Sequence, residues 1–444
     1  MKESTLKTAI LKIPQHFFGN AAFIVLMAYI LCLPLSMFCW LSFALDVHDF
    51  CLITLGAVVE LLAALYLMFE ILGGKISCMK DVLKFKTWDL FFLVLLIWSG
   101  ISALLAEDKE LALMGTGYRV EGFTTYLIYA GIYLCSKLIP RDKMKKLIVT
   151  YGISLSLLSV MTVVQINPHI QSALGTIGKN IARLEIRCMK YAAIFNNTNH
   201  YGYVLTMTIL GLAGLFMISK GYKKYIYLTL TCFNVWALII NDTFGCYLAS
   251  MIGLIFLVIL FAVRNKQSVG SGLLLLSLFA ATSIVTSVTN DGILLANFAV
   301  FFAETKPNSD LFQNNKAGSG RMGLWKQALK YIQERPLFGH GPEGLYYKYQ
   351  NDGFSNDRPH NEYLQYAAFT GIPSLIFYLG ALITMLVDCL KNLKKLPPEF
   401  VVIGGMIFAY CASAFFGNTM YYTSVYFFMF IGVLSTCHRK NSQI

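Results

Sequence analysis

The segment AAFIVLMAYILCLPLSMFCWLSFA, residues 21–44, carries no charged side chain along its whole length. A bilayer hydrocarbon core about 30 Å thick requires roughly 20 apolar residues of α-helix. The segment therefore predicts a membrane-spanning helix, and Pro34 predicts a kink within it. Asp46, His48 and Asp49 follow the segment in place of a small-residue cleavage site, so we expect no cleaved signal peptide.

The apolar character extends over the whole chain. Of 444 residues, 57% are hydrophobic and 14% are charged, against roughly 25% charged in a soluble domain. This composition, with a mean hydropathy of +0.60, excludes a soluble multidomain protein. We expect the net charge of +12 to follow the sidedness of the loops, with no nucleic-acid partner. The 11 cysteines include no CxxC pair, so neither a zinc site nor a disulfide framework is expected.

Apolar runs recur along the chain and predict an all-α, polytopic integral membrane protein with about twelve transmembrane helices. The expected spans are 20–44, 51–73, 88–106, 124–139, 147–165, 200–219, 225–240, 244–263, 271–289, 363–387, 400–416 and 421–437. Residues 1–289 would hold helices one to nine, and residues 363–444 would hold helices ten to twelve. Residues 290–362 between them form the longest polar stretch, which we expect to be a large, partly helical loop.

The charges of the connections predict the orientation. Cytoplasmic connections are enriched in Lys and Arg. With the N-terminus in the cytoplasm, every even-numbered connection is basic, and the short odd-numbered connections at 46–50, 241–243 and 417–419 have no Lys or Arg. We therefore expect a multi-pass plasma-membrane protein with both termini in the cytoplasm and residues 290–362 on the extracytoplasmic face.

Three segments on the expected outer side keep positive charge against this bias, namely 107–123, 166–199 and 290–362. An anionic ligand on that side would explain the charge. Arg119, Arg183 and Arg187 are candidates to bind it. The alternatives for Arg119 are an ion pair with Glu121 or a contact with lipid headgroups. The alternative for Arg183 and Arg187 is a solvated basic face.

The outer loop contains an expected helix from Ser319 or Gly320 to about Glu334. Arg321 and Trp325 lie on one face of it because they are four residues apart. Arg321 would bind phosphate while an apolar stripe docks the helix. The stripe consists of Met322, Trp325, Leu329 and Ile332. The alternative is an amphipathic helix that lies on the membrane surface.

His360 follows Pro359 at the expected outer end of a membrane helix, and Asn361 is a credible N-cap of that helix. The helix N-terminus and nearby arginines would both disfavour the imidazolium form. A neutral ring could accept a proton as a general base. The alternative is an interfacial histidine that only hydrogen-bonds the loop.

Residues 320–371 resemble the signature region of the O-antigen ligase and O-antigen polymerase superfamily. The matching residues are Arg321 with Trp325, Pro336-Leu337-Phe338-Gly339-His340-Gly341-Pro342, His360-Asn361-Glu362-Tyr363-Leu364-Gln365 and Gly371-Ile372. Two weaker resemblances lie upstream, around Arg119 in residues 118–122 and at Asn197-Thr198-Asn199-His200, which is similar to the Asn-Pro-Asn of the family. A Ser-Arg common in the family is missing at Asn241-Asp242-Thr243-Phe244-Gly245, and Arg183 or Arg187 could replace that arginine.

The resemblance implies a membrane glycosyltransferase that takes an oligo- or polysaccharide from undecaprenyl diphosphate and passes it to an acceptor hydroxyl outside the cytoplasm. The acceptor would be a glycan, a lipid or the cell wall, and neither a metal ion nor another cofactor is expected. His360 would be the catalytic base, with Arg321 and Arg119 neutralising the diphosphate. Asn199, Asn361 and Trp325 are expected to be further substrate contacts.

Other functions remain open from the sequence. Within the resemblance, a ligase that moves the chain to a terminal acceptor and a polymerase that extends it on the lipid are not distinguished. A transporter or flippase of lipid-linked sugars would also account for the helices and the positive outer face. A peptidoglycan polymerase of the shape-and-division type would need a different outer-loop motif.

Overall fold

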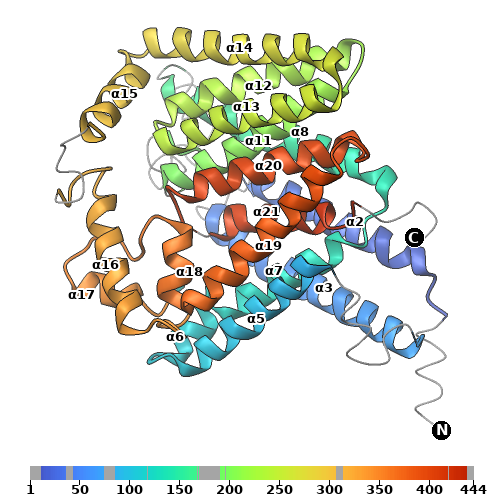
Figure 1. Cartoon of the computed structure of the whole chain (residues 1–444), viewed down its shortest axis with the longest axis vertical. Coiled ribbons are helices and arrows are strands. Elements are labelled where there is room, and N and C mark those ends of the chain that lie inside the picture. The colour runs from blue at the N-terminus through green and yellow to red at the C-terminus, as the bar shows by residue number, and fades with distance from the viewer. Residues whose placement is uncertain are drawn as a thin grey trace.

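The computed structural model describes residues 12–36, 44–74, 86–117, 119–167, 169, 191–195, 197–306, 314–418 and 420–437. Within these ranges the regular structure is helical, and no strand occurs (Figure 1). The candidate residues Arg183 and Arg187 lie outside the described residues.

Seven of the described helices are long and apolar enough to cross a membrane. They are α3 (Ala44–Leu72), α5 (Thr87–Leu105), α8 (Arg141–Ile166), α11 (Thr198–Ile218), α13 (Phe244–Arg264), α14 (Val269–Val288), which the short η1 (Lys266–Ser268) precedes, and α19 (Ile372–Lys391). Shorter apolar runs occur in α2 (Gln15–Ser36), α7 (Phe123–Ser136), α15 (Ile293–Glu304), α20 (Pro398–Ala414) and α21 (Tyr421–Leu434), and α12 (Tyr222–Ile240) is a further helix of the bundle. These helices agree with a polytopic membrane protein, whereas the total of about twelve spans stays a prediction.

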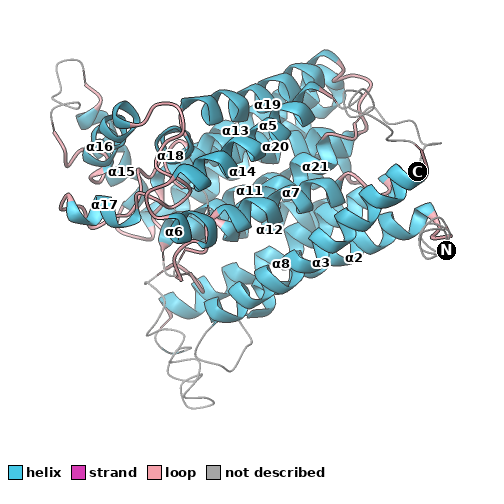
Figure 2. Cartoon of the chain, turned by 90° about the horizontal axis from the view of Figure 1, so that it is seen from below, coloured by secondary structure: helices cyan, strands magenta, loops and turns pink. Residues whose placement is uncertain are grey.

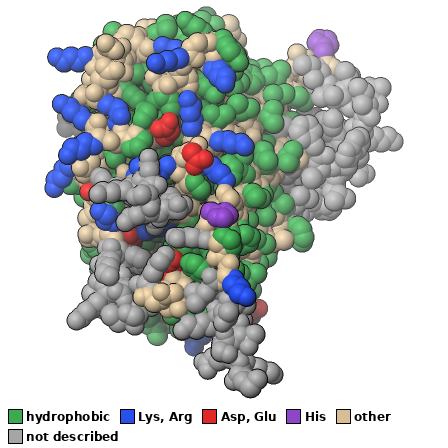
Figure 3. Space-filling view, turned by 90° about the vertical axis from the view of Figure 1, so that its right-hand side faces the viewer, with side chains coloured by type: hydrophobic (Ala, Val, Ile, Leu, Met, Phe, Trp, Pro, Cys, Tyr) green, Lys and Arg blue, Asp and Glu red, His purple; other side chains and the backbone are tan. Residues whose placement is uncertain are grey.

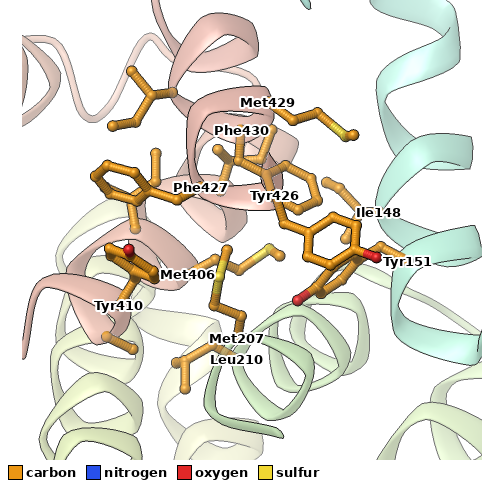
Figure 4. Close-up of a cluster of buried hydrophobic side chains, with 14 of the residues drawn as sticks. Ile148, Tyr151, Met207, Leu210, Met406, Tyr410, Tyr426, Phe427, Met429 and Phe430 are labelled. Atoms are coloured by element: carbon orange, nitrogen blue, oxygen red, sulfur yellow. The ribbon is translucent and has the colours of Figure 1, made fainter. Parts of the chain in front are cut away.

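The core of the bundle lies where α8, α11, α20 and α21 meet (Figure 4). Every residue of α21 is buried, and Tyr426 and Phe430 of this helix pack edge-on against Tyr151 of α8. Helices α11 and α20 approach each other closely because Gly214 lies opposite Val402, where a Cβ would come within 2.3 Å. Small residues that permit such close contact are typical of helix packing in membranes, where van der Waals contact replaces the hydrophobic effect.

The short helices gather at one end of the bundle (Figures 1 and 2). They are α6 (Lys109–Met114), α16 (Arg321–Glu334), α17 (Tyr346–Asn351) and α18 (Glu362–Thr370). Figure 3 views the opposite end, where Lys and Arg side chains gather in the left and central part of the view. The segments with the candidate motifs therefore lie together at the end of the bundle away from this basic face.

Three details differ from the sequence-based predictions. The span expected at 363–387 is broken into α18 and α19, because Gly371 between them adopts a φ of 92° and Pro373 lies in the first turn of α19. The loop expected at 290–362 also holds the apolar helix α15. The stripe expected on α16 is wrong at Leu329, which is 50% exposed.

The buried face of α16 is rotated from the expected stripe because the helix packs against α18. Leu324 and Tyr331 of α16 join Ala368 and Phe369 of α18 in one apolar cluster. The expected bounds of α16 are confirmed, since the helix runs from Arg321 to Glu334. Its contact with α18 links the segment that carries Arg321 to the segment that follows His360.

Candidate active site

A tight turn at residues 336–341 attaches the outer loop to the break between α18 and α19. Gly341 N donates to the Phe369 carbonyl over 2.7 Å, and Ile372 N donates to the Pro336 carbonyl over 2.8 Å. A Cβ on Gly371 would lie 1.9 Å from the Leu337 carbonyl oxygen, so only glycine permits this approach. The Pro–Gly turn thereby fixes the C-terminal end of α18.

The N-terminal end of α18 is fixed by one amide side chain and one carboxylate. The Asn361 side-chain oxygen accepts from Leu364 N over 3.0 Å, which confirms Asn361 as the N-cap. Glu362 is buried and accepts from the hydroxyls of Tyr378 in α19 and Tyr410 in α20, over 2.7 and 2.9 Å. The residue just before this cap, His360, is thus held by a helix anchored at both ends.

His360 is buried, with 7% of its surface exposed, and its φ of 51° lies in the left-handed region. Such a backbone conformation is uncommon for a residue other than glycine, and strained residues of this kind cluster at functional sites. Its Nε2 lies 3.2 Å from the side-chain oxygen of Asn356, and its Nδ1 lies 3.4 Å from Nδ2 of Asn418. The ring therefore has one amide at each nitrogen.

Burial and the positive charge of Arg321 lower the pKa of His360 to about 3, although the Asp357 carboxylate opposes the shift. The imidazole is therefore neutral at physiological pH. It has one nitrogen able to accept a proton, which is the state that a general base requires.

Arg321 is the first residue of α16 and lies against the N-terminus of α11. Its Nη2 donates to the Asn199 side-chain oxygen over 3.3 Å, and its Nη1 lies 3.4 Å from the Gly318 carbonyl oxygen. Within the described part of the chain, Nε is buried without a hydrogen-bond partner and no carboxylate forms an ion pair with Arg321. Burial lowers the pKa of the guanidinium, and a phosphate would supply the missing counter-charge.

Trp325 lies one turn further along α16. Its ring packs edge-on against Phe415, with the centroids 5.3 Å apart. Its Nε1 is buried and has no hydrogen-bond partner among the described residues. Since a buried indole N–H is usually paired, this donor is available to a ligand.

Arg119 has a different environment from Arg321. Its Nε and Nη2 donate to the two carboxylate oxygens of Asp357 over 2.9 and 2.8 Å. The pairing expected as an alternative, with Glu121, is not formed, and Glu121 instead accepts from the Tyr129 hydroxyl over 2.6 Å. Because a bidentate carboxylate already neutralises Arg119, Arg321 is better placed than Arg119 to attract an anion.

The sequence did not predict the buried charged residues that surround Arg119, namely Asp357, Arg358 and Glu343. Asp357 also accepts from Arg358 Nε over 3.0 Å, and Arg358, which is fully buried, donates to Glu343 over 2.7 Å. Burial raises the pKa of Asp357, but the charges of Arg358 and Arg119 outweigh it and hold the pKa well below its usual range. Glu343 in turn accepts from the backbone N–H of Thr116. The proximity of Asp357 and Arg358 to His360 in the sequence was the only signal for them.

His200 and Asn418 complete the site. His200, in the first turn of α11, is 3% exposed, and neither ring nitrogen has a hydrogen-bond partner in the described ranges. Its ring lies 5.4 Å from that of Tyr422, and it interacts electrostatically with His360 and Arg119. Asn418 lies in the connection between α20 and α21, where no motif pointed to it.

A model of the O-antigen ligase family matches residues 227–379. The match supports an assignment to the O-antigen ligase and polymerase superfamily for this segment of the chain. The matched segment contains Arg321, Trp325, His360 and Asn361, so the resemblance seen in the motifs is confirmed. No curated protein matches the chain.

The O-antigen ligase segment does not contain the whole site. Arg119, Asn199 and His200 precede it, and Asn418 follows it. The match supports, in general terms, a membrane enzyme of glycosyl transfer, with a lipid-linked glycan and an acceptor as its partners. The residues outside the match join the site through the hydrogen bonds and packing described above.

Proposed function

We propose that this chain is a plasma-membrane glycosyltransferase that moves a glycan from undecaprenyl diphosphate to an acceptor hydroxyl on the extracytoplasmic face. The single observation that carries the proposal is that one site holds both a neutral histidine and an arginine without an ion-pair partner among the described residues. His360 is buried and neutral, and Arg321 is partly buried with no ion-pair partner among the described residues. A base and an unneutralised cation are the two groups that this reaction needs.

The reaction breaks the bond between the anomeric carbon and the diphosphate oxygen. Arg321 neutralises the charge that develops on the leaving diphosphate, which makes a metal ion unnecessary. His360 takes the proton of the acceptor hydroxyl as the new carbon–oxygen bond forms. Attack from the side opposite the diphosphate inverts the anomeric centre.

The other candidate residues have supporting roles in this scheme. Asn199 holds the Arg321 guanidinium over 3.3 Å, and Asn361 holds the N-terminus of α18 next to His360. Trp325 Nε1 and both ring nitrogens of His200 have no hydrogen-bond partner among the described residues. These nitrogens can form hydrogen bonds with the hydroxyls of a sugar. Arg119 reaches the diphosphate only if Asp357 releases it, and Arg183 and Arg187 remain further candidates for that contact.

The polyprenyl chain of the donor needs an apolar path beside the site. A groove of about 280 Å³ lies near α5 and α7, and another of about 230 Å³ lies between α13, α19 and α20. We assign the polyprenyl chain to the second groove because Tyr363, three residues after His360, lines it. Its remaining lining is almost entirely aliphatic and aromatic, as a hydrocarbon chain requires.

The proposal is tested with purified protein, synthetic undecaprenyl-diphosphate oligosaccharide and candidate acceptors in the presence of EDTA. We expect transfer by the wild type and its loss in both His360→Ala and Arg321→Ala. Full turnover in His360→Ala would remove this residue as the base. A ladder of products on the lipid indicates a polymerase, whereas one transfer to an acceptor without the lipid diphosphate indicates a ligase. Movement of the donor across vesicles without any transfer would replace the proposal with a flippase.

A further inference from the structure

The two amides that contact the His360 ring differ in how they are held. Asn418 is 4% exposed, whereas Asn356 is only partly buried and lies in the loop before His360. Asn418 lies between α20 and α21, and the sulfur of Met420, two residues further on, lies 4.0 Å from Nη1 of Arg119. The partner of Nδ1 is therefore built into the bundle, and the partner of Nε2 is the one that a substrate can displace.

A neutral imidazole has one N–H and one lone pair, so the neighbour of one nitrogen decides what the other can do. An Asn side chain can present either its oxygen or its NH₂ group, since rotation by 180° exchanges two groups of nearly equal size. If Asn418 presents its oxygen, Nδ1 carries the proton and Nε2 carries the lone pair. If Asn418 presents its NH₂ group, as it does in the structure with Nδ2 3.4 Å from Nδ1, the lone pair lies at Nδ1 and is blocked by a buried side chain. In that orientation the buried Oδ1 of Asn418 has no hydrogen-bond partner among the described residues, and rotation of the amide by 180° brings this oxygen to Nδ1.

We propose that Asn418 is a positioning residue whose side-chain oxygen accepts Nδ1–H of His360 and so keeps the lone pair on Nε2. This inference rests on the proposed role of His360 as the base. This tautomer requires both amides to rotate by 180° from their orientation in the structure, where the oxygen of Asn356 lies 3.2 Å from Nε2. After rotation, Nδ2 of Asn356 donates to Nε2 in the resting enzyme, and the acceptor hydroxyl then takes its place. When the hydroxyl proton moves to Nε2, the Nδ1–H bond to Asn418 persists and the carbonyl dipole stabilises the imidazolium.

The electrostatics of the site explain why an amide suits position 418. The charged groups that act on the ring are Arg321 from α16, Arg119 from the segment before α7, and Asp357 and Arg358 from the loop before His360. The titratable ring of His200 from α11 also interacts electrostatically with His360. A carboxylate at 418 would add a negative charge next to Nδ1 and favour the imidazolium, which is no longer a base. Asn orients the ring as a carboxylate would, but leaves it neutral.

The test compares kcat, KM and the pH dependence of transfer in Asn418→Leu, Asn418→Asp and Asn356→Ala, with Asn392→Leu at the far end of α19 as a control. Asn418→Leu removes the acceptor, and we expect kcat to fall at least about 30-fold with KM within about two-fold. Asn418→Asp keeps an acceptor and has no N–H, so we expect activity within about three-fold of wild type at pH 8. Its acidic limb should lie at least about one pH unit higher than that of the wild type.

Two outcomes overturn the inference. Asn418 acts through its N–H if Asn418→Asp is as inactive as Asn418→Leu while its size-exclusion elution volume and its melting temperature remain those of the wild type. If Asn356→Ala loses more kcat than Asn418→Leu, the two amides have the opposite roles. Should Asn418→Leu fail to fold, the pH profile of Asn418→Asp decides alone, since an unmoved acidic limb also overturns the inference. Wild-type transfer and its loss in His360→Ala are measured alongside, so failure of the proposed function is recognised separately.

Discussion

Fully buried Arg358 donates from Nη2 to Oε1 of Glu343 over 2.7 Å, fifteen residues away in the chain. The same arginine holds Asp357, which holds Arg119, so the ion pairs join the segment before α7 to the loop before α18. His360 lies two residues after Arg358, and its position therefore depends on this network.

Arg358→Leu is expected to destabilise the protein by about 3–5 kcal/mol, because it leaves the buried Glu343 carboxylate unpaired. The matched control is Arg335→Leu, which breaks a surface pair with Glu107 whose carboxylate side chain is 74% exposed. That change should cost no more than about 1 kcal/mol. Thermal unfolding in detergent measures the stability of both variants. Equal losses of stability would show that the buried ion pairs stabilise the protein no more than the surface pair does.

Arg321→Gln is expected to raise the pKa of His360 above about 3, because Arg321 has the largest effect on that pKa after burial. A base is lost as the pH falls through its pKa. Protonation of His360 should therefore leave wild-type kcat/KM unaffected from pH 5 to 7, as expected from a pKa of about 3. The residual activity of Arg321→Gln should instead decline at a higher pH than that of the wild type. An identical acidic limb in both proteins would argue against electrostatic coupling between these residues.

His200→Phe is expected to keep or raise thermal stability, since neither ring nitrogen of His200 has a partner within the described residues and the aromatic contact with Tyr422 is retained. We expect KM for the glycan donor or acceptor to rise at least about five-fold, because a hydrogen bond to a sugar hydroxyl is lost. Kinetics and melting are measured on the same preparation. Unchanged KM for both substrates would exclude a substrate contact for His200.

Gly404→Phe is expected to obstruct the groove that we assign to the polyprenyl chain. Gly404 lines the groove, and a Cβ at this position meets no atom within 4 Å, so the new side chain begins in open space. We expect KM for a long-chain donor to rise more than that for a donor with a short lipid. Gly270→Phe is the control, because Gly270 has equally open space and lies outside the groove. Equal effects of Gly404→Phe on both donors would place the lipid elsewhere.

Much of the fold follows from local features of the sequence. Long apolar runs predict membrane helices, and the helix of Arg321 was predicted to its end at Glu334. The N-cap at Asn361 was predicted from residue type alone. The break at Gly371 was missed because an apolar run reads as one span, whereas the approach of Leu337 to the glycine is a contact between distant segments.

The sequence by itself determined the class of protein, the charge bias of its connections and the presence of Arg321 and His360, because hydropathy, helix capping and short motifs act over a few residues. Only the tertiary structure decided the neighbours of these residues. Arg119 meets Asp357 across 238 positions, and Asn418 meets His360 across 58. Such pairs arise from the packing of α7, α18, α20 and α21, and local sequence does not encode which buried charge or amide will lie opposite another.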